Sequence, residues 1–141
     1  MRRLIACAGL ALAASALLVG CSGGSGVAVL DTEQTEQDVR VVTIKDSVDP
    51  ESTRLLAEHE GIRFYLGKIA EGAVPPRSLC LTAVPLDDPS QGLTACGGHG
   101  GSGFGGGTSE YDMEFVPDGG HPELEVGEVR VHENLIVRIK G

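Results

Sequence analysis

The chain contains little aromatic side-chain surface. None of its 141 residues is a tryptophan, and two tyrosines and three phenylalanines are its whole aromatic supply. Aromatic side chains bury the largest area per residue, so any core must be small and mainly aliphatic. In a domain of about 100 residues such a core gives only marginal stability, which favours a covalent cross-link.

Basic residues are also scarce, since 11 Lys and Arg accompany 20 Asp and Glu. An acidic surface is repelled by the phosphate backbone of nucleic acids and by anionic lipid headgroups. We therefore expect no nucleic-acid partner. Any membrane association has to come from a covalent lipid rather than from a basic patch.

No apolar run reaches the ~20 residues of a membrane-spanning helix. The longest one, residues 4–19, is uncharged and follows Met1, Arg2 and Arg3. A short positive segment before an apolar run of this length is typical of a signal peptide, and the arginines stay on the cytoplasmic side. We expect the chain behind this segment to be exported.

The apolar run ends in the sequence Leu-Val-Gly-Cys at residues 18–21, which matches a lipobox, and a Ser/Gly stretch follows. The thiol of Cys21 is nucleophilic enough to take a diacylglycerol group, and Gly20 leaves room for a peptidase. We expect cleavage after residues 1–20, acylation of Cys21 with palmitate or similar chains, and a flexible tether over residues 21–45. The chain would then be membrane-bound on the extracytoplasmic face. The alternative is an ordinary secretory signal cut at an Ala-rich site.

Two cysteines remain once Cys7 leaves with the signal and Cys21 carries lipid. Cys80 and Cys96 are separated by 15 residues, and an oxidising compartment favours their pairing. Closing a loop of this length restricts the unfolded chain by about 3 kcal/mol. We predict a structural disulfide, because a redox-active pair is more often spaced as C-x-x-C.

Residues 46–141 are expected to form one small β-rich domain. Residues 39–44 are β-prone, and we expect a first strand there. Asp49, Pro50 and Glu51 have the pattern of a helix start, and Gly61 fits its end, so we expect a short helix between them. Beyond Gly61 the apolar period changes to two, which predicts strands.

These strands can be placed approximately. A hairpin around the loop 85–92 would bring Cys80 and Cys96 to facing positions, and a tight turn is expected near residues 133–134. Residues 97–107 are mostly glycine and are expected to form a loop rather than a packed element. The fold class is thus mainly β (α+β), an antiparallel sheet or sandwich preceded by one short helix.

Several short motifs occur together here: the lipobox, Gln34-Thr35 with Asp38, the sequence ESTRLL at residues 51–56, Phe64-Tyr65, and Cys80 with Cys96. In this combination the chain resembles small lipoproteins of actinobacteria. The resemblance supports the membrane location and the disulfide, and it implies no catalytic residues.

No catalytic set can be assembled from the remaining motifs. The sequence Gly101-Ser102-Gly103 lacks the last glycine of a nucleophile elbow, because Phe104 follows. Cys80, Cys96, His99 and His121 could be drawn as a zinc site, but a disulfide removes both thiolates. His121-x-Glu123-x-Glu125 is more often a solvated acidic strand face than a metal site.

We therefore expect a non-enzymatic binding or interaction module without a metal or cofactor. Its partners would be the membrane, through the lipid, and an envelope protein or ligand. The alternative is an envelope metal-binding protein or small hydrolase that uses His99 and His121.

Overall fold

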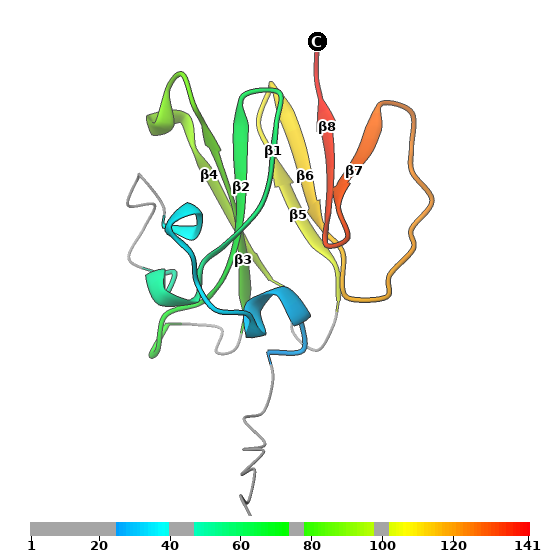
Figure 1. Cartoon of the computed structure of the whole chain (residues 1–141). Coiled ribbons are helices and arrows are strands. Elements are labelled where there is room, and N and C mark those ends of the chain that lie inside the picture. Colours follow the sequence, from blue (N-terminus) through cyan, green and yellow to red (C-terminus); the bar gives the residue numbers. More distant parts are fainter. Residues whose placement is uncertain (1–24, 40–46, 74–77, 98–101) are drawn as a thin grey trace, which may run out of the picture.

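The computed structural model describes residues 25–39, 47–73, 78–97 and 102–141. Within these ranges, two four-stranded antiparallel sheets with the orders β1-β2-β3-β4 and β5-β6-β8-β7 face each other (Figure 1). The strands are β1 (Arg54–His59), β2 (Ile62–Lys68), β3 (Leu79–Pro85), β4 (Leu93–Gly97), β5 (Phe104–Gly107), β6 (Tyr111–Phe115), β7 (Glu128–His132) and β8 (Leu135–Ile139). The expectation of a mainly β antiparallel sandwich is confirmed.

The core lies between the sheets and follows the alternation seen in the sequence. Phe64 and Leu66 on β2 are fully buried, as is Leu135 on β8. The rings of Phe64 and Tyr111 meet edge to face across the two sheets, with centroids 6.3 Å apart. Phe104 and Phe115 form a second ring contact, with centroids 5.1 Å apart, and the other core residues are mainly aliphatic.

The β3–β4 hairpin carries the predicted disulfide. Cys80 and Cys96 are direct partners in the antiparallel register, and their sulfur atoms are bonded. The connection between the strands contains a 3₁₀ turn, η4 (Pro89–Gln91), which Asp88 starts by accepting the backbone N–H of Ser90. The prediction of a disulfide across facing hairpin positions is confirmed.

The predicted helix between Asp49 and Gly61 is wrong. Asp49 does accept the N–H of Glu51, but only one 3₁₀ turn follows, η3 (Pro50–Ser52), before β1 begins. Glu60 and Gly61 have φ angles of 48° and 74°, which is the conformation of a two-residue hairpin turn. A register shift between Leu55 and Ala57 makes Leu56 the extra residue of a β-bulge, and Leu56 and Ala57 both contact the core.

The expected loop over residues 97–107 is wrong in part, because residues 104–107 form the strand β5, while residues 98–101 lie outside the described residues. Its glycines allow close approach to neighbouring strands. A Cβ atom on Gly106 would lie 2.9 Å from the Cβ of Ala95 on β4, and one on Gly105 would lie 2.6 Å from the carbonyl oxygen of Met113 on β6. Because glycine has no side chain, β5 can pack closely against β4 of the other sheet.

The folded domain begins well before residue 46. Val27 and Leu30, on either side of the start of η1 (Ala28–Asp31), are 4% and 5% exposed and belong to the core. The prediction of a flexible tether over residues 21–45 did not account for these two apolar residues, which lie between a Ser/Gly stretch and an acidic stretch. The expected strand over residues 39–44 lies outside the described residues, apart from Val39.

Two motifs that are far apart in the sequence hold this segment in place. Gln34 donates from its amide to the carbonyls of Pro50 and Thr53 at 2.9 and 3.1 Å, and the guanidinium of Arg54 donates to the carbonyl of Thr32. Asp38, in η2 (Glu36–Asp38), accepts the N–H of Leu55 at 2.7 Å. The motifs around Gln34 and Arg54 thus have a structural role.

The sandwich has two ends, which we name from their positions in Figure 1. The lower end contains η1 and the turns at 117–120 and 133–134, the latter as predicted. The upper end contains the turn at 60–61, the loop between β3 and β4, and the end of β8. Strands of five to seven residues separate the two ends by roughly 20 Å.

Candidate functional site

A cleft of about 470 Å³ opens at the upper end, between the ends of the two sheets. On the first sheet, the N–H of Leu86 donates to the carbonyl of Gly61 at 2.8 Å. On the second sheet, the N–H of Lys140 donates to the carbonyl of Glu110 at 2.7 Å. Because both bonds are between backbone atoms, the positions of the two walls do not depend on side-chain rotamers.

The cleft has an apolar lining that is partly open to solvent. Leu86 and Ile139 stand on opposite walls and are 44% and 39% exposed, while Ile62 and Pro85 are buried beneath them. Apolar side chains gathered in a hollow with a polar rim are typical of an interaction site.

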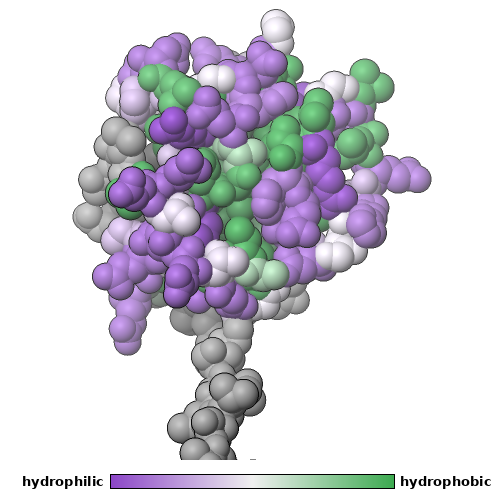
Figure 2. Space-filling model, in the orientation of Figure 1, coloured by the Kyte–Doolittle hydropathy of each residue, from purple (hydrophilic) through white to green (hydrophobic). Residues whose placement is uncertain are grey.

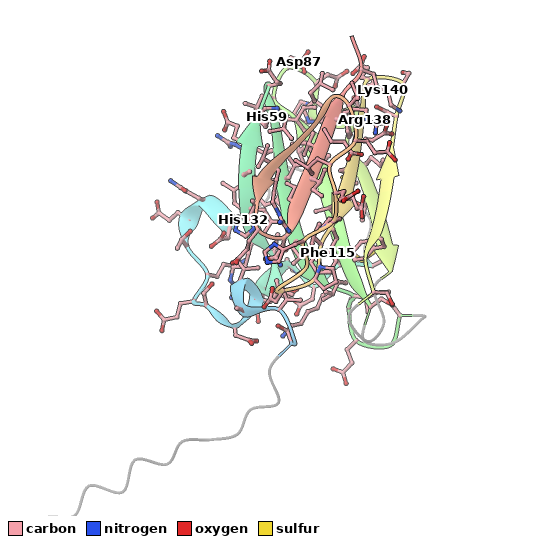
Figure 3. The ribbon with its side chains drawn as sticks, turned by 90° about the vertical axis from the view of Figure 1, so that its right-hand side faces the viewer. His59, Asp87, Phe115, His132, Arg138 and Lys140 are labelled. Atoms are coloured by element: carbon pink, nitrogen blue, oxygen red, sulfur yellow. A yellow bond between two sulfur atoms is a disulfide. The ribbon has the colours of Figure 1, made fainter. Side chains whose placement is uncertain are left out.

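The rim of the cleft is anionic. Glu60, Asp87 and Glu110 line it, and none of these carboxylates has an ion-pair partner among the described residues. Lys140 is the rim cation, but its ammonium lies 2.7 Å from Asp112. Figure 3 shows Asp87 and Lys140 at the same end of the molecule. A cationic group entering the cleft would therefore meet unpaired negative charge.

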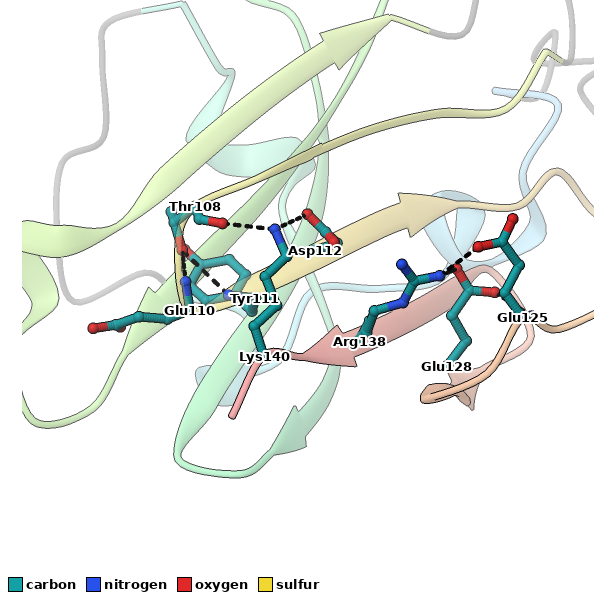
Figure 4. A network of polar contacts seen from close by, with 8 residues as sticks. All are labelled: Thr108, Glu110, Tyr111, Asp112, Glu125, Glu128, Arg138 and Lys140. Carbon is teal, nitrogen blue, oxygen red and sulfur yellow. Dashed lines mark hydrogen bonds and ion pairs between the residues drawn. The ribbon is translucent and has the colours of Figure 1, made fainter.

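A second hollow, of about 550 Å³, lies on the outer face of the second sheet above the glycines of β5. Its one basic lining residue is already paired, since Arg138 contacts Glu125 at 2.6 Å and Glu128 at 2.9 Å (Figure 4). The hydrogen bond with Glu125 is the main cause that raises the pKa of Arg138. Lys140 also donates to the carbonyl of Thr108 at 2.8 Å. This surface holds a preformed ion-pair network, so its charges are less available to a ligand than those at the upper end.

Further exposed apolar residues lie on β7 and on the chain leading into it. Leu124, Val126 and Val129 are 48%, 98% and 46% exposed. Figure 2 shows hydrophobic surface on this side of the molecule and along the seam between the two sheets. Acidic residues alternate with this group, and it forms no hollow with the cleft residues.

The sequence-predicted site residues are only partly brought together. Cys21 and His99 lie outside the described residues. Cys80 and Cys96 form the disulfide, which excludes them as thiolate zinc ligands. His121 is exposed, with its Nδ1 atom 3.4 Å from the Arg130 guanidinium, and residues 121–125 are not part of a strand. No group of three or more His, Cys, Asp or Glu side chains that could hold a metal occurs in the ranges that the structure covers.

His132, directly before the turn at residues 133–134, is partly buried at the lower end (Figure 3). Its Nδ1 atom accepts the N–H of Asn134 at 3.1 Å. Burial lowers the pKa of His132, and the negative charges of Glu133 and Asp118 oppose this effect. A histidine that accepts at Nδ1 must give up this bond when that atom is protonated.

Sequence reasoning missed the two apolar residues of the cleft. Leu86 lies in the expected loop 85–92, and Ile139 follows Leu135 and Val137 at apolar positions two residues apart, which is the pattern of a buried strand face. The sequence did contain a signal for Leu86, because an apolar residue directly before two aspartates, Asp87 and Asp88, is unusual in a polar turn. The exposure of Ile139 depends on where β8 ends relative to β2 and β3, which no local pattern encodes.

No protein-family model matches the chain, and no curated protein or solved structure matches it either. Among the described residues, no helix has the length and apolar character needed to cross a membrane.

Proposed function

We propose that this chain is an exported lipoprotein, cut before Cys21 and held on the extracytoplasmic face of the cell membrane by acyl chains on that residue. The observation that carries the proposal is the sequence Leu-Val-Gly-Cys at residues 18–21, directly after a positive segment and an uncharged apolar run. Two or three acyl chains give stable anchoring, whereas a single chain is only marginal.

The disulfide between Cys80 and Cys96 supports this location. Structural disulfides persist in oxidising compartments and are rare in the cytosol. The excess of acidic over basic residues supports anchoring by lipid, since a net negative chain is repelled by anionic headgroups.

The domain is proposed to be a non-enzymatic binding module that uses the upper cleft. Its occupant would be a segment of an envelope protein in which a Lys or Arg neighbours an apolar residue. Charge complementarity supports this choice, because the rim carboxylates of Glu60, Asp87 and Glu110 surround the apolar pair Leu86 and Ile139.

The anchor is tested by the variant Cys21→Ser in the producing cell. We expect it to stay unprocessed, to lose labelling by a clickable fatty acid, and to move from the detergent phase to the aqueous phase in a Triton X-114 separation. Cys7→Ser is the matched control, because Cys7 lies in the predicted signal, and it should behave as wild type. Unchanged labelling and partitioning of Cys21→Ser would contradict the proposal.

The cleft is tested with the full-length protein in detergent micelles and two short capped peptides, Lys-Leu-Lys-Leu and Glu-Leu-Glu-Leu. We expect the basic peptide alone to bind. Glu60→Gln and Glu110→Gln should each weaken this binding roughly two- to five-fold, as the loss of one exposed charge contact predicts. Glu123→Gln, at an exposed position outside the cleft, is the control. Equal binding of both peptides, or equal weakening by Glu123→Gln, would show that the cleft is not the site.

A further inference from the structure

The described chain enters the domain at the lower end and is fixed there from its first residues. The N–H of Ser25 donates to the carboxylate of Asp31 at 3.0 Å, and the N–H of Ala28 donates to Asp118 at 2.7 Å. Val27 and Leu30 add buried apolar contacts. Residue 25 is therefore part of the folded body and not part of a flexible tether.

Three residues, 22–24, separate Cys21 from this fixed point. Consecutive Cα atoms are about 3.8 Å apart, so the four steps from Cys21 to Ser25 span at most about 15 Å. This is less than the roughly 20 Å between the two ends of the sandwich.

We infer that the lower end of the sandwich lies against the phospholipid surface and that the upper cleft faces away from it. The inference rests on the proposed acylation of Cys21. The spacer is too short for the domain to turn over and place its upper end on the bilayer.

The chemistry of the lower end indicates contact without insertion. Asp31, Asp118 and Glu133 are exposed there, and carboxylates at these described positions do not favour insertion into the headgroups. The short covalent spacer keeps the domain at the surface. The cleft is then held roughly 20 Å or more above the membrane, where an envelope protein can reach it.

Fluorescence quenching in vesicles tests this orientation. The acylated protein is reconstituted in phosphatidylcholine vesicles containing a lipid with a headgroup nitroxide. A fluorophore is attached to Glu133→Cys at the lower end or, in a second variant, to Ser109→Cys in the turn at the upper end. Both positions are exposed, and neither side chain forms a hydrogen bond or an ion pair. We expect quenching several-fold stronger at residue 133 than at residue 109.

Lengthening the spacer provides the matched control. Twelve Gly and Ser residues inserted after Gly24 should reduce the quenching at residue 133 to nearly that at residue 109. Equal quenching at both positions with the natural spacer, or no change after the insertion, would overturn the inference. Mass spectrometry of the amino-terminal peptide separates the two proposals, because a peptide without acyl groups contradicts the lipoprotein proposal before any quenching is measured.

Discussion

Asp38 accepts the backbone N–H of Leu55 at 2.7 Å, which joins the segment before the sandwich to its first strand. The same carboxylate accepts the N–H and the hydroxyl of Thr35 at 2.6 and 2.8 Å. It is 6% exposed and lies near the guanidinium of Arg54. At this edge of the sheet, the buried carboxylate of Asp38 thus accepts a backbone hydrogen bond that a neighbouring strand would otherwise accept.

Removing this carboxylate should destabilise the protein. In Asp38→Ala the N–H of Leu55 and the turn at Thr35 lose their acceptor, and a buried unpaired donor costs about 1–3 kcal/mol. We expect a loss of this size in the free energy of unfolding, measured by urea denaturation. Glu36→Ala is the control, because Glu36 is exposed and its side chain makes no polar contact. Equal effects of the two variants would contradict the role of Asp38.

The contribution of Asp38 to the free energy of unfolding should depend on pH. Burial by itself raises the pKa of Asp38, but hydrogen bonds from Leu55 and Thr35 and the charge of Arg54 together lower it below the ordinary value of 3.8. The stabilisation is therefore complete above pH 3.8 and is lost as the pH falls through the lowered pKa of the folded state. The difference between wild type and Asp38→Ala should shrink in that acidic range, as measured by urea denaturation at each pH.

His132 should make the free energy of unfolding depend on pH in a second, less acidic range. Its pKa is lowered by burial, so the unfolded chain binds a proton more readily than the folded chain does. Stability is complete above the ordinary pKa of 6.5 and falls as the pH decreases below it. His132→Gln, which keeps an acceptor near the N–H of Asn134, should flatten the unfolding free energy between pH 7 and 5. An unchanged slope would rule out His132 as its origin.

The sheet framework could be predicted because its signals are local. The apolar residues of β2, β3, β6 and β8 alternate with period two, and the facing cysteines follow from one hairpin. The helix prediction failed at Leu55 and Leu56, because a β-bulge at Leu56 interrupts the period-two alternation of the strand. The strand β5 and the burial of Val27 could not be predicted, since both depend on contacts with residues far away in the chain. The upper cleft was missed for the same reason.

The packing of β5 against β4 leads to a double-mutant prediction. A Cβ on Gly106 would lie 2.9 Å from the Cβ of Ala95, closer than real Cβ atoms approach, so Gly106→Ala should force the two strands apart. Overpacking of this kind costs about 1–3 kcal/mol. Adding Ala95→Gly removes the opposing atom and should recover part of the loss, giving a coupling energy of at least about 0.5 kcal/mol by urea denaturation. Additive effects would show that the two strands do not touch there.

The hydroxyl of Tyr111 provides a substitution that should not destabilise the protein. Tyr111 is 1% exposed, and its hydroxyl oxygen has no hydrogen-bond partner in the described part of the chain. Burial raises its pKa, and the nearby charge of Glu110 adds to this. A buried hydroxyl without a partner carries a desolvation cost of about 1–3 kcal/mol. Tyr111→Phe keeps the ring contact with Phe64 and removes this cost, so the free energy of unfolding should stay equal or rise by about 1 kcal/mol.

The matched control is Tyr65→Phe. Tyr65 is also buried, at 2% exposure, but it interacts with the guanidinium of Arg63. Removing its hydroxyl should therefore lower the melting temperature, whereas Tyr111→Phe should keep or raise it. Because the two substitutions delete the same atom from similarly buried rings, the sign of the difference reports on what each hydroxyl contacts. Destabilisation of Tyr111→Phe as large as that of Tyr65→Phe would show that the Tyr111 hydroxyl has a partner in solution.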